Sequence, residues 1–176
     1  YLASLYWHLH FQYNGWFLFA AMGLFYTYLS EIDFMPTSPS TVLILFAIAA
    51  IPTFGLSILW LSLPGWAVIG LAVFALLQVI AWIIFIYHLK KSSFSLATLL
   101  PKPIGAVWAV AAIAFTVKLF MQLASTIPSL SILAFGFRPI VLAYLHLIFL
   151  GIFSLFLIGY IFRLNSVPLS ALAKKG

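Results

Sequence analysis

The sequence predicts an all-α integral membrane protein, a polytopic helix bundle with about five transmembrane helices. Of its 176 residues, 66% are hydrophobic and only 6% are charged, and the mean hydropathy is +1.24. Soluble domains carry about 25% charged residues. Cysteine is absent, which excludes disulfides, thiolate metal sites, iron–sulfur clusters and covalently attached haem.

Apolar stretches of about 20 residues are long enough to span a bilayer, and the chain contains five of them. The expected helices cover residues 2–29, 41–63, 66–89, 104–124 and 139–162. Pro36 and Pro39 follow the first stretch, and Pro52 is expected to kink the second. Pro64-Gly65 predicts a tight turn before the third.

The connections after the third stretch are of two kinds. A Ser-rich loop leads from Lys90-Lys91 to the prolines that open the fourth stretch, and residues 125–137 read as a looser apolar loop. A short basic tail follows the fifth stretch. We therefore expect residues 1–176 to form a single transmembrane domain. Because Tyr1 stands where an initiator methionine is expected, we interpret the chain as a fragment of a longer polypeptide and of a larger bundle.

The cations predict the topology. Five spans place the two termini on opposite sides, and the positive-inside rule makes the cation-rich side cytoplasmic. Only Arg138 lies in a loop on the other side. The side on which the first helix ends carries Lys90, Lys91, Lys102, Arg163, Lys174 and Lys175. We expect a bacterial inner-membrane protein with an outer N-terminus and a cytoplasmic C-terminus. Because the cations are scattered, nucleic acid is not expected as a partner.

His8 and His10 are the strongest candidates for a functional site. Ionisable residues are expensive inside a bilayer and usually face a protein interior, a partner or a cofactor. Positions i and i+2 of an α-helix lie roughly 200° apart, so the two imidazoles point in nearly opposite directions and each suits a different centre. Imidazole ligates haem iron and copper. The alternative is a pair of interfacial histidines beside the aromatic residues Tyr6 and Trp7.

The other polar residues of the outer half of the membrane extend this candidate site. His146 is an isolated histidine in an apolar span, either a metal ligand or a structural hydrogen-bonding residue. Lys118 either snorkels outward or pairs with a carboxylate of a cofactor, such as a haem propionate. Gln12 and Gln122 fall at the same depth. His88, beside Lys90, is interpreted as an interfacial anchor, and Gly151 and Gly159 as ordinary helix-packing positions.

One segment resembles a known family. The run His8-Leu9-His10-Phe11-Gln12-Tyr13, followed by Gly15 and Phe17, resembles the tenth helix of the catalytic subunit of haem–copper oxidases. The resemblance implies that His8 ligates the high-spin haem and His10 the low-spin haem. It also implies that residues 41–63 and 66–89 correspond to the last two helices of that core.

The resemblance covers about thirty residues and has clear departures. The arginine pair that follows this helix in the family is missing, and residues 104–124 and 139–162 have no counterpart. The copper ligands of the family would lie upstream of Tyr1. The NnrS-type family of membrane proteins, which contain haem and copper and are associated with nitric oxide stress, is a related possibility. Its multi-histidine helices are similar to residues 142–151.

Together these observations predict a haem-binding integral membrane protein that acts in electron transfer or in the reduction of a small gas, oxygen or nitric oxide. The expected cofactor is non-covalent b-type haem, with copper as an alternative. His8, His10 and His146 are the candidate metal ligands, and Gln12 and Lys118 are further cofactor-binding candidates. The chain would be an oxidoreductase component surrounded by lipid and by other membrane subunits or the rest of its own chain. The competing hypothesis is an accessory or assembly subunit without a cofactor.

Overall fold

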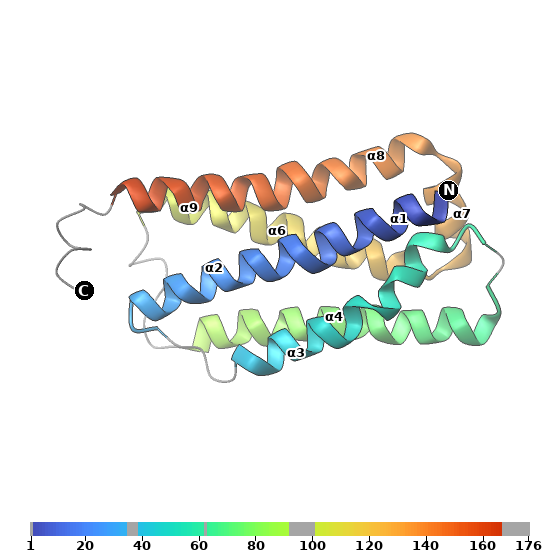
Figure 1. The fold of residues 1–176 in the computed structure, drawn as a ribbon, viewed down its shortest axis with the longest axis horizontal. Helices are drawn as coiled ribbons and strands as arrows, with labels where there is room; N and C mark the ends of the chain where they lie inside the picture. The colour runs from blue at the N-terminus through green and yellow to red at the C-terminus, as the bar shows by residue number, and fades with distance from the viewer. Residues whose placement is uncertain (1, 35–38, 62, 92–100, 167–176) are drawn as a thin grey trace.

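The computed structural model describes residues 2–34, 39–61, 63–91 and 101–166, and within them every element is helical. The first rod joins α1, a π-helical segment η1 and α2, and the last joins α8, a second π-helical segment η3 and α9 (Figure 1). The elements are α1 Leu2–Phe11, η1 Gln12–Phe17, α2 Leu18–Glu31, α3 Pro39–Ala50, the 3₁₀ segment η2 Pro52–Ile58, α4 Gly65–Lys91, α6 Lys102–Ala124, α7 Pro128–Gly136, α8 Arg138–His146, η3 Leu147–Ser154 and α9 Leu155–Ser166. The predicted all-α bundle is thus confirmed.

The expected breaks follow proline chemistry. The helix axis bends by 44° between α3 and η2, which confirms the kink predicted at Pro52. Residues 125–137, expected to be a loop, instead contain α7. Pro128 opens this helix at a first-turn position, where a missing N–H costs nothing. The Ser-rich loop and the basic tail, including Lys174 and Lys175, lie outside the described residues.

Membrane-spanning character is clearest in three helices. Residues 65–90, 102–124 and 138–164 are long and apolar enough to cross a bilayer, and the bent pair of α3 and η2 makes a fourth candidate. The first rod is not among these candidates. Its first half carries His8, His10, Gln12 and Asn14, which lower its hydropathy. The described residues therefore support three to four spans by composition, packed with a fifth, more polar rod.

The two ends of the bundle differ in character. We call the end where Leu2 lies the amino end and the end where α2 finishes the acidic end. The chain begins at the amino end and α9 finishes at the acidic end, as Figure 1 shows. There Arg163 donates a hydrogen bond to the Glu31 carboxylate, and its guanidinium lies 4.5 Å from the centre of the Tyr28 ring. This pair joins the ends of the first and last rods.

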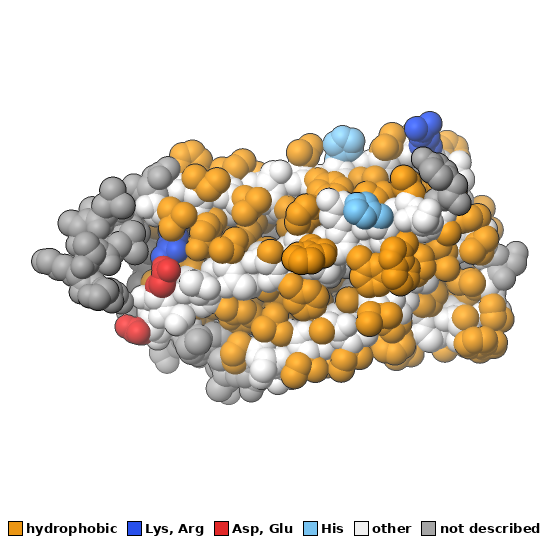
Figure 2. All heavy atoms as spheres, viewed as in Figure 1, with side chains coloured by type: hydrophobic (Ala, Val, Ile, Leu, Met, Phe, Trp, Pro, Cys, Tyr) orange, Lys and Arg blue, Asp and Glu red, His pale blue; other side chains and the backbone are white. Residues whose placement is uncertain are grey.

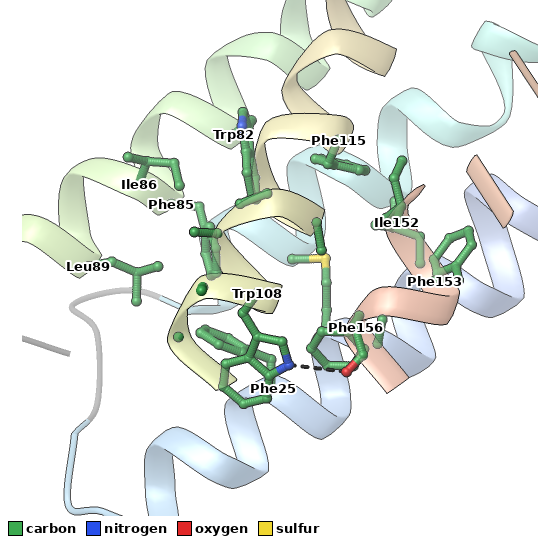
Figure 3. A pocket seen from close by; sticks show the side chains of 18 of the residues that line it. Phe25, Trp82, Phe85, Ile86, Leu89, Trp108, Phe115, Ile152, Phe153 and Phe156 are labelled. Atoms are coloured by element: carbon green, nitrogen blue, oxygen red, sulfur yellow. Dashed lines mark hydrogen bonds between the residues drawn. The ribbon is translucent and has the colours of Figure 1, made fainter. Parts of the chain in front are cut away.

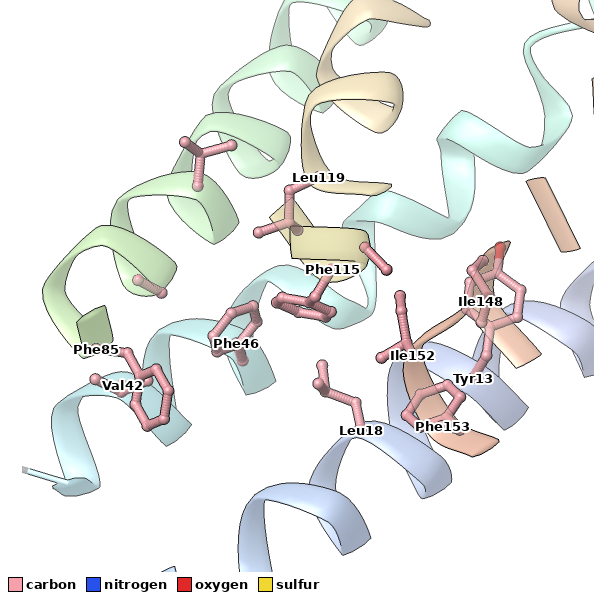
Figure 4. Close-up of a cluster of buried hydrophobic side chains, with 13 residues drawn as sticks. Tyr13, Leu18, Val42, Phe46, Phe85, Phe115, Leu119, Ile148, Ile152 and Phe153 are labelled. Carbon is pink, nitrogen blue, oxygen red and sulfur yellow. The ribbon is translucent and has the colours of Figure 1, made fainter. Parts of the chain in front are cut away.

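The core consists of apolar and aromatic side chains where the rods meet. Phe46 of α3 and Phe115 of α6 lie with ring centroids 6.0 Å apart, beside Leu18 and Ile152 (Figure 4). Lipid tails are as apolar as these side chains, so close packing, rather than escape from water, holds membrane helices together. The shape of the core therefore matters more than its hydrophobicity.

The glycines predicted to serve helix packing do so against α6. A Cβ at Gly159 would overlap the indole of Trp108, whose Nε1–H is held by the Phe156 carbonyl at 3.1 Å. A Cβ at Gly151 would lie 3.4 Å from the Cβ of Ala114, an ordinary contact. Close approach of the last rod to α6 thus requires glycine at 159 and tolerates alanine at 151.

Candidate functional site

Helix geometry separates the two histidines of α1 as predicted. His10 faces the bundle interior and is 1% exposed, whereas His8 lies on the outer surface. The inward position surrounds the His10 ring with aromatic side chains, including Phe54 at a centroid distance of 5.9 Å. The two imidazoles therefore occupy different environments and have different chemical roles.

Both ring nitrogens of His10 are hydrogen bonded. Its Nε2–H donates to the carbonyl oxygen of Ala50 at 2.9 Å. Its Nδ1 therefore accepts, from the Asn14 amide at 3.2 Å and from the Ser57 hydroxyl at 3.4 Å. This pattern defines the neutral tautomer that carries its proton on Nε2. In this arrangement His10 is not available as a haem ligand, in contrast to the role that the oxidase resemblance implies.

Lys118 is the centre of a buried polar network that begins at His10. The lysine is 2% exposed and donates to Asn14 Oδ1 at 2.6 Å and to Gln122 Oε1 at 2.6 Å. The Asn14 amide passes the chain of hydrogen bonds on to His10 and so to Ala50. Of the two alternatives expected for Lys118, outward snorkelling is wrong, because side-chain amides inside the bundle hold its ammonium group. Pairing with a carboxylate of a cofactor stays a prediction.

A second arm of the network runs from Lys118 through Gln122. The Gln122 amide donates to Gln78 Oε1 at 2.9 Å, and Gln78 donates to Thr53 Oγ1 at 3.4 Å. Thr53 in turn donates to the Ala49 carbonyl at 2.7 Å. Both arms therefore start at the lysine and end on the last turn of α3, just before the bend. In every hydrogen bond along the two arms, the donor is the group nearer to the Lys118 amine in the network.

No carboxylate balances Lys118 within the described part of the chain. Glu31 and Asp33 lie at the acidic end, and the partners of the lysine are neutral amides together with the Phe115 ring, whose centroid lies 5.7 Å from Nζ. Oriented amide dipoles of this kind stabilise a cation only if every member of the network is satisfied. The network thus places strong constraints on the rotation of α1, α4 and α6.

A small cavity of about 110 Å³ adjoins the network on the side of the amino end. Its lining includes His10 and Asn14 of the first rod, Ser57 of η2, and Tyr13 and Tyr144. The Tyr13 phenol is in hydrogen-bonding contact with Ser57 and Tyr144. The volume is enough for a few water molecules at about 30 Å³ each. Hydroxyl groups therefore line the route between the network and the amino end.

His146 shares the outward orientation of His8. Figure 2 shows the exposed histidine side chains of this face over α1 and α8, at the half of the bundle nearer the amino end. The Nδ1–H of His146 donates to the Leu142 carbonyl, one turn back in its own helix, at 2.7 Å. In the neutral imidazole with this Nδ1–H, Nε2 is the nitrogen left with a lone pair.

Both rods that carry these histidines widen into a π-helix directly after them. Segment η1 begins two residues after His10, η3 begins immediately after His146, and the two segments are in contact. Aromatic rings fill the contact, with Phe17 and Phe153 at a centroid distance of 5.4 Å. Because π-helical turns are rare and often occur at functional sites, this depth of the bundle is the most distinctive region of the fold.

The predicted site residues thus separate into two groups. His10, Lys118 and Gln122 come together in the core, whereas His8 and His146 face outward. Gln12 is half-buried and is not a member of the network. His88 lies near the acidic end beside Tyr87, with ring centroids 5.9 Å apart, so its anchoring role remains a prediction.

The sequence interpretation missed three members of the two arms of the network, Asn14, Gln78 and Thr53. Gln78 is a single polar residue within a long apolar span, and Thr53 follows the bend-forming Pro52. Both signals were present in the sequence. Whether such a polar side chain faces the interior of the bundle depends on the rotation of its helix, and the composition does not define that rotation.

The described residues contain no group of three or more His, Asp or Glu side chains arranged to hold a metal ion. No family model, curated protein or solved structure matches the chain. The geometry of the site is therefore the basis for any functional inference.

Proposed function

We propose that this protein is a haem-binding integral membrane protein and a component of an electron-transferring oxidoreductase that acts on a small gas such as oxygen or nitric oxide. The haem would lie against the face that presents His8 and His146. The observation that carries the proposal is the arrangement of His146, whose Nδ1–H is held by a backbone carbonyl while its side chain is exposed on the outer surface of the bundle.

This state is the one that a ligating imidazole needs. Metal-bound histidines almost always donate the second ring N–H to a carbonyl or a carboxylate, which fixes the ring and raises its basicity. The Leu142 carbonyl performs this role for His146 at 2.7 Å. A purely structural histidine would gain more from turning its free nitrogen toward a donor inside the bundle.

His8 supports the same face. Its side chain is exposed on the rod that also carries the exposed Trp7 and Trp16, and polar side chains that face hydrocarbon are costly. Two such imidazoles on one face favour a surface that a haem and another helix cover. When bound, haem supplies an iron centre for electron transfer and gas binding. The role of this chain is to present the imidazoles and to provide flat aromatic walls.

Haem is favoured over copper by the number of ligands required. A haem iron needs one or two axial ligands from the protein, whereas a copper site of histidines needs about three. The described residues offer separate histidines and no cluster of three. A copper ion would therefore take most of its ligands from another part of the polypeptide or from a partner subunit.

We further propose that the amino end of the bundle faces the outside and the acidic end the cytoplasm of a bacterial inner membrane. Lys90, Lys102 and Arg163 lie at the acidic end, and Arg138 lies at the amino end. The positive-inside rule assigns the cation-rich end to the cytoplasm. The histidine face then lies in the outer half of the membrane.

Absorption spectroscopy of the purified full-length protein, expressed with ample haem, tests the proposal. We expect a Soret band that His146→Ala and His8→Ala weaken or shift, each in a different way. His88→Ala, near the other end, is the matched control and should leave the spectrum unchanged. His10→Ala should mainly lower the stability of the protein, because the His10 ring joins Asn14 to the Ala50 carbonyl in the buried network.

Absence of a Soret band from the wild-type protein would overturn the haem proposal and favour the accessory-subunit hypothesis. One observation already supports that second candidate. The buried polar residues are satisfied by one another, so packing alone accounts for His10, Lys118 and Gln122. If the wild type carries haem but neither His8→Ala nor His146→Ala alters its spectrum, the assignment of the outward face is wrong.

A further inference from the structure

A second, larger cavity lies in the half of the bundle toward the acidic end. Its volume is about 520 Å³, within the range of about 300–1,000 Å³ that is typical of ligand pockets. Figure 3 shows its walls, with Phe25 from α2, Phe85 and Leu89 from α4, and Trp108 from α6. Protein interiors are close-packed and tolerate few voids, so a space of this size requires an occupant.

The cavity exists because α6 is narrow where α4 is bulky. The wall formed by α6 includes Gly105, Ala109 and Ala112, each one turn of helix from the next. Opposite them, α4 presents large side chains such as Trp82 and Phe85, whose rings stack with centroids 5.2 Å apart. Small residues normally let membrane helices approach each other closely. Here they leave a groove.

The N–H groups of the two indoles that line the cavity already donate hydrogen bonds within the protein. Trp82 Nε1–H donates to Thr116 at 2.8 Å, and Trp108 Nε1–H donates to the Phe156 carbonyl at 3.1 Å. Apart from these indoles, Lys102 contributes the only polar side chain among the described residues of the lining. A quinone or steroid head that needs hydrogen-bond donors deep in the cavity would find none. The chemistry of the walls suits a hydrocarbon chain.

The position of Lys102 defines the entrance. It is exposed at the start of α6, at the acidic end of the bundle, and it lines the cavity. From Lys102 to Phe115, the deepest α6 residue of the lining, the helix rises about 20 Å. One leaflet of hydrocarbon is about 15 Å deep. The cavity therefore runs from headgroup level to near the bilayer centre, with a cation at its mouth.

We propose that this cavity binds an acyl chain of an anionic phospholipid from the leaflet at the acidic end, with the phosphate group at Lys102. The depth matches one leaflet, the walls match a hydrocarbon chain, and the ammonium matches the headgroup charge. This inference does not depend on haem binding.

Native mass spectrometry of the full-length protein, exchanged into detergent with phosphatidylglycerol or phosphatidylcholine of the same acyl chains, tests the proposal. We expect one retained lipid per protein and about fivefold stronger retention of phosphatidylglycerol, the preference that one lysine near the surface provides. Lys102→Gln should abolish this preference. Arg138→Gln, at the other end, should retain it.

Filling the cavity provides the second arm of the experiment. Ala112→Leu should reduce lipid retention about tenfold, because a well-packed space resists additional methylene groups. Ala143→Leu, an exposed position on α8, is the matched control and should have no effect. Gly105→Leu, near the entrance, repeats the test if Ala112→Leu fails to fold.

Three results would overturn the proposal. In the first case the wild type retains no lipid under conditions that preserve its fold. In the second case the filled variants retain as much lipid as the wild type. In the third case the retained molecule would be an isoprenoid quinone.

Discussion

Replacement of Asn14 by alanine is the sharpest test of the buried network. Asn14 connects Lys118 to His10, accepting at 2.6 Å and donating at 3.2 Å. A hydrogen bond that involves a charged group contributes about 1.5–3 kcal/mol, and a neutral one about 0.5–1.5 kcal/mol. The two bonds together therefore contribute about 2–4.5 kcal/mol.

The membrane environment lowers this figure. Interhelical hydrogen bonds measured in a membrane protein average about 0.6 kcal/mol, because the unfolded helices also find partners in the bilayer. Lys118 is nevertheless fully buried, and the described residues offer it no carboxylate. We expect Asn14→Ala to lower the free energy of unfolding by about 2 kcal/mol, above the average for a neutral bond.

Unfolding by sodium dodecyl sulfate in mixed micelles, followed by tryptophan fluorescence, measures this difference. Thr27→Ala is the control, since Thr27 is exposed and bonds only to the Gly23 carbonyl of its own helix at 3.0 Å; its effect should stay within about 0.5 kcal/mol. The double variant Asn14→Ala/Lys118→Met should lose at least about 1 kcal/mol less than the sum of the single variants. Strict additivity, or a single effect below the control, would refute the network.

Two further predictions concern packing and topology. Gly159→Ala should destabilise the protein by about 1–3 kcal/mol in the same assay, because the new Cβ overlaps the hydrogen-bonded Trp108 indole, whereas Gly151→Ala should be nearly neutral. Equal effects at both glycines would contradict this account of the contact with α6. A cysteine at Ala173 should resist an impermeant thiol reagent in intact cells, while a cysteine at Phe137, exposed at the amino end, should react. The reverse pattern would invert the topology.

Much of the fold could be predicted because hydropathy and proline act locally. A long apolar run in a bilayer must be helical, since no water is available to satisfy its backbone. The bend at Pro52 follows from the missing N–H of proline. The helix at residues 128–136 was not predicted, because a nine-residue apolar segment is too short to be distinguished from a loop by periodicity.

The level of each site residue along the bundle could be predicted from the sequence, whereas the direction of its side chain was harder to predict. Counting residues along each span placed His10, His146 and Lys118 in one half of the membrane. Whether a side chain at that depth points inward depends on the rotation of its helix. That rotation is set by contacts between distant residues, such as Lys118 with Asn14, 104 positions apart in sequence. The opposed directions of His8 and His10 were predictable because both residues lie on one helix.

The bend explains why His10 is buried while the other two histidines are not. After Pro52 the chain turns as a 3₁₀-helix, and Phe54 N–H bonds to the Ile51 carbonyl at 3.2 Å in place of the Ala50 carbonyl of an α-helical turn. His10 Nε2–H bonds to the Ala50 carbonyl. The Thr53 hydroxyl also donates to this carbonyl, at the longer distance of 3.3 Å. Buried carbonyl groups are almost always hydrogen bonded, so the imidazole has a structural task there.

The described residues show no such task for the outward histidines. His146 uses only Nδ1, and it bonds to a carbonyl of its own helix, which does not require a histidine at that position. His8 takes part in neither arm of the network. Hydrocarbon would offer neither ring a donor or an acceptor, so at that depth both side chains are costly unless something covers them. The hydrogen bonds of His10 therefore remove it from the set of candidate haem ligands. The haem proposal rests on His8 and His146, which the buried network does not use.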